Sequence, residues 1–395
     1  MKKLILSILI IVLIFIVPAA AAFAANPAEI LEVPDVKIIM DGKLTQFQDV
    51  PICIGQNTLL PLRELLVNLG VPNDDTHIVY NANEKSVTVY KDQTKLYLAV
   101  GNQTAYVNDQ PVKLNIAPVG YNKYQRIYIA FRFVAEALGK IVVWDGSSNA
   151  ILVCDAVQFD QIRQIMDRSD EAMKQAGKYR QVTDLKGTVK SGQITMNIKM
   201  NVEANIDKLQ KQMYMKMNMD MLGMEIITDT YYNKNVSYFQ DPLNQTWEKK
   251  TYLPAEYDML FEDQSNMEML LANDSLCAGL VRMPDVRSDE ILLKGNVYLN
   301  QLLEKSMAGQ GAASQMIGED AVKFDLFTVE ISLNSNTYLV NSISLNASST
   351  QISGKSTAKT DIWVTVKNSD FNGDFQIIVP EDIVKNAVEE NQIKK

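Results

Sequence analysis

The stretch 212-QMYMKMNMDMLGMEIITDTYY-232 decides how the second half of this chain folds. Methionine occupies every second position from Met213 to Met221, with polar or aromatic residues between. Successive side chains of a β-strand point to opposite faces, so this spacing predicts a strand with one face made entirely of methionine. On a helix the same residues would spread around the whole surface, which is not the pattern of an amphipathic helix.

A methionine face has two interpretations. Methionine is unbranched and polarizable, and it is common where an apolar surface accepts ligands of varied shape. The face is therefore either the core side of a sheet or an apolar groove for an amphipathic ligand. The candidate groove residues are Met196, Ile198, Met200, Met213, Met215, Met217, Met219, Met221 and Met224.

Copper(I) is a more distant alternative, because soft thioether sulfurs select this ion. Alternate residues of a strand stand about 7 Å apart, which is too far for two of their sulfurs to share one ion unless the strand bends. The polar residues Lys216, Asn218 and Asp220 on the reverse face also suit a solvated sheet. We therefore expect no metal ion and no cofactor.

The amino terminus has the pattern of a secretory signal peptide. Lys2 and Lys3 precede an apolar run, and the small-residue sequence Ala22-Phe23-Ala24 follows. The run is shorter than the roughly 20 residues that span a bilayer as a helix. We expect residues 1–25 to be removed near Ala24, the mature chain to carry no transmembrane segment, and the protein to be extracellular or associated with the cell envelope.

Composition excludes several functions. The net charge of −9 argues against nucleic acid as a partner. A catalytic nucleophile needs a base such as histidine, and the single histidine, His77, has no plausible catalytic partners in the sequence. No phosphate-binding glycine loop is present either, so we expect no enzyme activity. Three cysteines are an odd number for a disulfide framework, and buried thiols are the favoured state. A bridge between Cys53 and Cys154 stays open as a second interpretation.

The first half contains one pattern twice. Residues 58–70 (TLLPLRELLVNLG) are echoed by residues 127–139 (IYIAFRFVAEALG). Arg63 matches Arg132 and Gly70 matches Gly139 at the same interval, so each copy predicts a short helix closed by glycine. A hairpin follows each helix. Each arginine is expected to donate hydrogen bonds to carbonyls across the repeat interface, with glycan binding as the alternative role.

These residues resemble the copper amine oxidase N-terminal-like stalk domain over about residues 36–155. The resemblance rests on PLRELLVNLG, YVNDQPVKLNIAP and FRFVAEALGKIVVWD, the last of which supplies the trailing Trp144. Asn68 and Tyr80 depart from the usual glutamate and tryptophan, and Ala130-Phe131 replaces the usual Pro-Leu. The resemblance implies a surface spacer that contacts a cell-wall or surface-layer component. It does not imply an oxidase, since copper ligation there needs three histidines.

The second half predicts a helix over 155–177, strands from Met196 to Thr251, helices over 255–280 and 289–307, and strands again from 322 to 367. With EAMKQAGKYR, the methionine strand and YYNKNVSYFQDPLNQTWEKK, this order resembles LolA- and LppX-like lipoproteins over about 157–390. That superfamily is a half-open barrel with an apolar cavity for lipid chains. The lipobox cysteine usual in such lipoproteins is absent here.

Together these patterns predict an α+β chain. A signal peptide (1–25) precedes a duplicated strand–helix–hairpin stalk module (36–155) and a curved antiparallel half-barrel with helices across one face (156–395). The predicted function is a non-catalytic envelope protein that binds a lipid or another amphipathic small molecule. The alternative is a structural or adhesive surface protein with no ligand.

Overall fold

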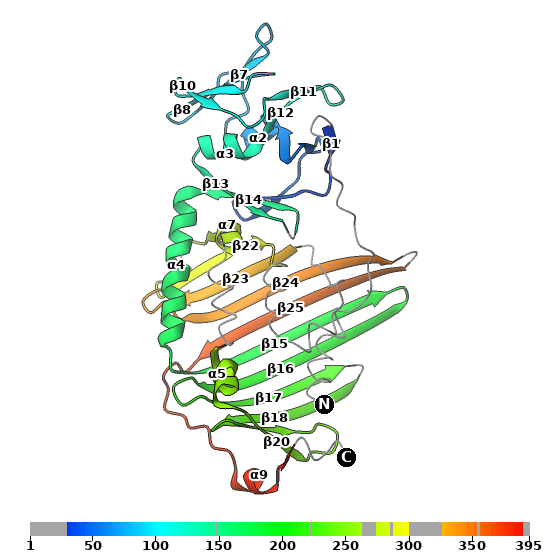
Figure 1. Ribbon diagram of the computed structural model, residues 1–395, viewed down its shortest axis with the longest axis vertical. Helices are drawn as coiled ribbons and strands as arrows, with labels where there is room; N and C mark the ends of the chain where they lie inside the picture. Colours follow the sequence, from blue (N-terminus) through cyan, green and yellow to red (C-terminus); the bar gives the residue numbers. More distant parts are fainter. Residues whose placement is uncertain are drawn as a thin grey trace. The chain divides into compact units, whose positions relative to one another are not determined.

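The computed structural model describes residues 30–146, 148–221, 223–262, 274–284, 287–299, 326–353 and 356–389. The chain divides into two compact units: the described residues up to Gln161 together with Cys277–Gly279, and the others from Ile162 onward. Strands far outnumber helices in both units (Figure 1). The predicted signal peptide, residues 1–25, lies outside the described residues.

The first unit is built from short strands and two short helices. In chain order its elements are β1 (Ile30–Glu32), β2 (Lys37–Met40), β3 (Lys43–Thr45), β4 (Ile52–Ile54), β5 (Asn57–Pro61), α2 (Leu62–Asn68), β6 (Ile78–Asn81), β7 (Ser86–Lys91), β8 (Thr94–Ala99), β9 (Thr104–Val107), β10 (Gln110–Lys113), β11 (Val119–Tyr121), β12 (Arg126–Ala130), α3 (Phe131–Ala137), β13 (Lys140–Asp145) and β14 (Ala150–Asp155).

Three small sheets organise these strands, in the orders β1-β4-β5-β12-β11, β10-β9-β8-β7-β6 and β13-β14-β2-β3. At the centre of the first sheet β5 and β12 pair antiparallel, with Leu60 opposite Ile129. Each of these strands runs directly into a helix, α2 or α3, and both helices contribute leucine, valine or alanine side chains to one hydrophobic core. Strand pairing therefore brings together two segments that are far apart in the sequence.

Both helices end at a glycine in the left-handed conformation. The φ angle is +83° at Gly70 and +76° at Gly139. A side chain at either position would be strained in this conformation, so glycine is the residue that closes these helices with least cost.

The second unit holds most of a long helix, one large sheet and shorter helices; the start of the long helix (156–161) and residues 277–279 belong to the first unit. The elements are α4 (Ala156–Gln175), β15 (Lys178–Ser191), β16 (Ile194–Asp207), β17 (Gln212–Met221), β18 (Met224–Asn233), β19 (Val236–Gln240), β20 (Trp247–Thr251), α5 (Pro254–Glu262), α7 (Asp274–Gly279), β21 (Leu280–Arg282), β22 (Glu290–Val297), β23 (Leu326–Asn334), β24 (Val340–Ser353), β25 (Ser356–Ser369), α9 (Glu381–Asn386) and β26 (Val388–Glu389).

The large sheet has 12 strands in the order β21-β22-β23-β24-β25-β15-β16-β17-β18-β19-β20-β26 and forms a half-barrel (Figure 1). All neighbours pair antiparallel except β20 and β26. The strand β15 joins two antiparallel meanders, β16–β20 and β21–β25, into one sheet, because it pairs with β16 on one side and with β25 on the other. The long helix α4 buries Ile162, Met166 and Met173, as the helical spacing predicted.

Two sequence predictions for this unit need correction. The helix expected over 289–307 is wrong for residues 290–297, which form β22 and pair with residues 327–334 of β23. Ile291, Leu293 and Val297 are buried at strand spacing there, and Gly295 disfavours a helix by about 1 kcal/mol. The long strand β15 was not predicted, because Gln181, Thr183 and Gly187 interrupt its apolar alternation.

No disulfide joins the three cysteines. Cys154 and Cys277 are buried, as expected, whereas Cys53 is only half-buried. Burial raises the pKa of the Cys154 thiol to about 12, so this group stays protonated at neutral pH. Among the helices that the structure describes, none combines the length and hydropathy that a membrane crossing requires.

Candidate ligand-binding face

The methionine strand β17 lies in the interior of the large sheet, between β16 and β18. Directly paired residues of neighbouring strands point to the same face. The pairs Met200–Met219 and Val202–Met217 extend the methionine face onto β16, and Ile226 extends it onto β18. The predicted strand is therefore present, and its apolar face continues on both sides.

The same face continues across the sheet far beyond the methionines. Register aligns one apolar row across seven neighbouring strands: Val329, Leu345, Val364, Leu185, Met200, Met219 and Ile226. From β22 to β18, none of the described positions that share this face is occupied by Asp, Glu, Lys or Arg. The result is one broad, uncharged face, of which sequence reasoning found only the part on β16–β18.

Burial along this row is uneven. Val329 at one end is buried, and so is Met219, which is only 1% exposed and pairs with half-buried Ile226 at the other end. Leu345, Val364, Leu185 and Met200 between them are half-buried. Half-buried apolar side chains in the middle of a sheet are unusual, since a core face would normally be closed at its centre. This part of the face is the best candidate for contact with a ligand.

A helix covers one end of the methionine strand. Met213 is 4% exposed and packs in a cluster with Tyr257 and Phe261 of α5 and with Tyr179 of β15. The Tyr257 hydroxyl donates to the Lys211 carbonyl at 2.7 Å, which fixes α5 over this end. Met213 is therefore a core residue.

The other predicted groove residues occupy several environments. Met196, Met200, Met215 and Met217 are half-buried, and we call these four the central methionines. Ile198 is buried, and Met224 is 57% exposed at the β17–β18 turn, where it pairs with Met221. The side chain of Met221 lies outside the described residues. The prediction placed all of these residues in one groove, whereas the structure gives them several degrees of burial. The central methionines share only their half-buried state: Met215 also packs against the α5 cluster, and Met196 pairs with Val189 near the β15–β16 turn.

The reverse face is polar and solvated. Asn201 donates to Asp184 at 2.9 Å, Asn218 donates to Glu225 at 2.8 Å, and the Tyr214 hydroxyl donates to Asp229 at 2.7 Å. Burial, with the hydrogen bond to Asp229 second, raises the pKa of Tyr214 above its ordinary value. The two faces of the sheet are thus chemically distinct, as the alternation of apolar and polar residues predicted.

Three polar side chains on the apolar face are hydrogen-bonded within the protein. The Gln181 amide donates to Asn368 Oδ1 at 3.0 Å, and the Asn368 amide donates to the Val340 carbonyl at 3.0 Å. The Thr228 hydroxyl donates to the Gln240 carbonyl at 2.6 Å. These side chains therefore break the apolar surface without adding charge. Among the described residues, no group of three or more histidine, cysteine or carboxylate side chains is placed to hold a metal ion.

In the first unit, the motif arginines hydrogen-bond to carbonyls of the hairpin that follows their own helix. Arg63 donates to the Ile78 carbonyl at 3.4 Å and to Asn73 Oδ1 at 3.1 Å, and it lies 3.6 Å from Asp75. Arg132 donates to the Val142 carbonyl at 3.0 Å. Each arginine therefore ties a helix to the next strand. The predicted carbonyl partners are present, but in this structure they belong to the arginine's own helix–hairpin segment.

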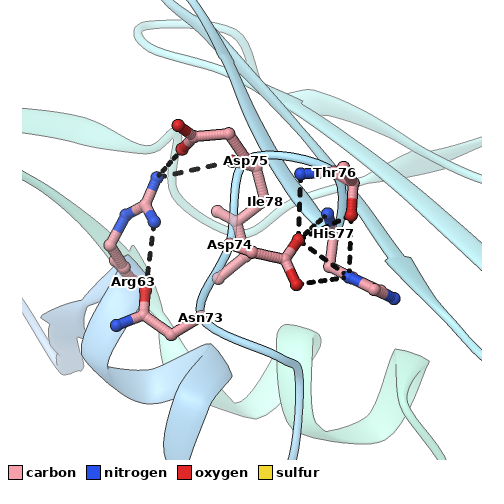
Figure 2. A network of polar contacts seen from close by, with 7 residues as sticks. All are labelled: Arg63, Asn73, Asp74, Asp75, Thr76, His77 and Ile78. Atoms are coloured by element: carbon pink, nitrogen blue, oxygen red, sulfur yellow. Dashed lines mark hydrogen bonds and ion pairs between the residues drawn. The ribbon is translucent and has the colours of Figure 1, made fainter.

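Figure 2 shows the loop that holds Arg63. Asp74 turns away from the arginine and accepts hydrogen bonds from the backbone N–H groups of Thr76 at 2.9 Å and His77 at 2.8 Å (Figure 2). The Thr76 hydroxyl and then His77 hold the pKa of the Asp74 carboxyl well below its ordinary value. The carboxylate thus organises the loop that presents Asn73 and Asp75 to Arg63.

Comparison with known proteins supports the assignment of the first unit. The family described as "Copper amine oxidase N-terminal domain" matches residues 39–153, which confirms the resemblance found in the sequence. No curated protein matches the chain significantly.

Similar solved structures cover a little over half of the chain. LprF from Mycobacterium bovis shares 11% identity with a TM-score of 0.34, over 56% of this chain and 97% of that chain. A DUF1329 family protein from Desulfovibrio piger shares 9% identity with a TM-score of 0.20, over 56% and 95%. A putative outer membrane lipoprotein-sorting protein domain from Vibrio parahaemolyticus shares 8% with a TM-score of 0.19, over 58% and 98%. Scores this low assign no ligand.

Proposed function

We propose that this chain is an exported, non-catalytic cell-envelope protein whose half-barrel sheet binds a lipid-like or other amphipathic ligand on its apolar face. The uncharged row from β23 to β18 carries the proposal, because its middle is half-buried. Covering apolar surface stabilises a complex by about 25 cal/mol per Å². An acyl chain lying across this row would remove such surface from water, and the flexible methionines would adapt to its shape.

The polar groups at one side of the face fit the other end of an amphipathic molecule. Gln181 and Asn368 lie on the same face as Leu185 and Val364, so their amides border the apolar row. Asn368 is only 7% exposed, but the half-buried Gln181 amide has a second N–H and a carbonyl oxygen beyond the N–H that it gives to Asn368, and these can meet a ligand's polar head. An uncharged, hydroxyl- or ester-bearing head suits this border better than a strongly charged one.

A structural protein with no ligand is the second candidate. It is favoured by the packing at Met213, where Tyr257 and Phe261 of α5 fill the methionine face with the protein's own side chains. In this alternative the central methionines are also covered by the chain itself, and the sheet serves only as a rigid body.

Lipid uptake distinguishes these candidates. We expect a fluorescent fatty-acid analogue to bind the purified full chain, and native mass spectrometry to find lipid on protein from its own host. Changing Met217→Gln keeps the size of the side chain but places an amide on the apolar face, so the Kd should weaken by about tenfold or more. The matched control is Lys216→Gln, which changes the neighbouring residue on the reverse face and should leave Kd unchanged. No probe binding together with empty native spectra would refute the carrier proposal.

We further propose that the first unit is a duplicated stalk, residues 36–155, and that residues 156–395 form the ligand-binding domain. The β5–α2 and β12–α3 segments support the duplication, since each joins a strand to a short helix closed by a left-handed glycine. A stalk of this kind would hold the half-barrel near a cell-wall or surface-layer component.

Export makes a separate prediction about the mature chain. We expect the protein isolated from its host to begin at Ala25 or Asn26, because signal peptidase would cut after Ala22-Phe23-Ala24. Intact-mass measurement and amino-terminal sequencing read this directly. Recovery of the chain with Met1 to Ala24 still attached would overturn the proposed export.

A further inference from the structure

The first unit contains two grooves that are built from the same positions of the repeated pattern. One has a volume of about 800 Å³, and residues of α2 form part of its wall. The other has a volume of about 540 Å³ and is lined at the start of α3. Both volumes lie in the range of ligand-binding sites.

Each groove is lined by the helix of one repeat and by the strand that precedes the helix of the other repeat. The α2 groove is lined by Arg63 together with Gln125 and Arg126 from the start of β12. The α3 groove is lined by Arg132 together with Gln56 and Asn57 from the start of β5. The antiparallel pairing of β5 with β12 produces this exchange, because it lays the start of each strand beside the end of the other.

An exposed aromatic ring completes each groove. Tyr80 on β6 lines the α2 groove and is 52% exposed, and Trp144 on β13 lines the α3 groove and is 47% exposed. Each ring stands two residues after the carbonyl that its groove arginine binds, Ile78 for Arg63 and Val142 for Arg132. The guanidinium and the ring are therefore fixed to the same strand in both grooves.

The charges of the grooves are largely compensated. Arg126 lies 3.3 Å from Asp49, and Arg63 lies 3.6 Å from Asp75. Arg132 lies 3.5 Å from Glu136. A compensated arginine still offers several N–H donors in a planar fork, but it attracts anions weakly. With a net charge of −9 on the whole chain, an anionic polymer is disfavoured further.

We propose that the two grooves are equivalent binding sites for a neutral glycan. A sugar ring presents an apolar C–H face that stacks on an aromatic side chain, and its hydroxyls pair with the amide and guanidinium groups beside it. Two sites on one unit would bind a repeating polymer more tightly than either site alone. This inference is independent of the lipid-binding proposal, because both grooves lie in the first unit.

The test is retention on insoluble neutral polysaccharides (cellulose, chitin, mannan and cross-linked dextran), followed by calorimetry with the tetrasaccharide of the polymer that retains the full chain. We expect two tetrasaccharides to bind per chain. Tyr80→Ala or Trp144→Ala should weaken one of the two sites by about tenfold. The double variant should lose retention on the polymer. Tyr90→Ala is the matched control, since Tyr90 is 43% exposed in the same unit and lines neither groove.

Melting curves keep this test interpretable. Both target rings are exposed, so the variants should melt as the unchanged protein does. If an aromatic variant fails to fold, Gln56→Ala and Gln125→Ala test the same two sites. Retention on none of the four polymers would overturn the proposal, as would equal retention of the double variant. Binding only to an anionic polymer such as polygalacturonate, lost at high salt, would likewise overturn it.

Discussion

Replacing Met213 by alanine should lower the free energy of unfolding by about 2–5 kcal/mol, whereas the same change at Met217 should cost well under 2 kcal/mol. The two residues stand on one face of one strand, so the substitution is chemically the same. They differ in packing: Met213 is 4% exposed beneath Tyr257 and Phe261, and Met217 is half-buried. Truncating a packed side chain leaves a cavity that its neighbours cannot fill. A side chain at a partly open site makes fewer packing contacts, so its truncation lowers the free energy of unfolding less.

Urea unfolding of the two variants, with and without the fatty-acid analogue, measures this difference. Met224→Ala supplies the baseline, because this methionine is 57% exposed and should cost almost nothing. The ligand should stabilise the unchanged protein and the Met213→Ala variant alike, and the Met217→Ala variant less. A loss above about 3 kcal/mol at Met217 would mean that this residue is core, and the carrier proposal would fail for this strand.

The strand β17 could be predicted from the sequence, but the burial of its individual methionines could not. Strict alternation of methionine over nine residues is compatible with a strand and not with an amphipathic helix, so β17 and its two faces could be predicted. Whether each methionine is covered depends on α5, which comes from a segment over 30 residues further along the chain. Periodicity carries no information about such tertiary coverage, and so it grouped core residue Met213 with half-buried Met217.

The errors in the half-barrel have a similar cause. The segment 290–297 contains adjacent apolar residues, Ile291, Leu292 and Leu293, and a short run of this kind fits either a helix or a strand. Pairing with β23 decides the matter, because it satisfies every backbone group of β22 on that side. The strand β15 gains its stability from neighbours on both sides, which compensate for polar and glycine positions that weaken its own pattern.

Some residues of the two grooves in the first unit could be predicted from the sequence. The repeated arginines were identified, and glycan binding was weighed for them. Gln56 and Gln125 also recur at the same interval, which could have added them. The sequence could not predict that each groove combines the helix of one repeat with the strand of the other, because this arrangement follows from the pairing of β5 with β12. Only that pairing places Gln125 beside Arg63 and Gln56 beside Arg132.

Oxidation provides the second large effect. Mild peroxide should abolish most of the uptake of the fatty-acid analogue while leaving the melting temperature nearly unchanged. A sulfoxide turns an apolar methionine into a polar one, and the central methionines are accessible enough to react in the folded chain. Met213 and Met219, at 4% and 1% exposed, should be protected and should keep the sheet intact. Among the described methionines of β16–β18, peptide mapping by mass spectrometry should therefore find oxygen first on Met224, then on the central methionines.

A variant without sulfur at these four positions shows whether these side chains cause the loss. Leucine has nearly the size of methionine and no sulfur, so changing Met196, Met200, Met215 and Met217 to leucine should cost little stability and preserve uptake. This variant should retain binding at a peroxide dose that inactivates the unchanged protein. If the face were a closed core, the order would reverse, because sulfoxides would form at Met217 only after the fold had opened. The melting temperature would then fall together with uptake, and no dose would separate the two. The separation of these two curves thus measures how open the centre of the half-barrel is to a ligand.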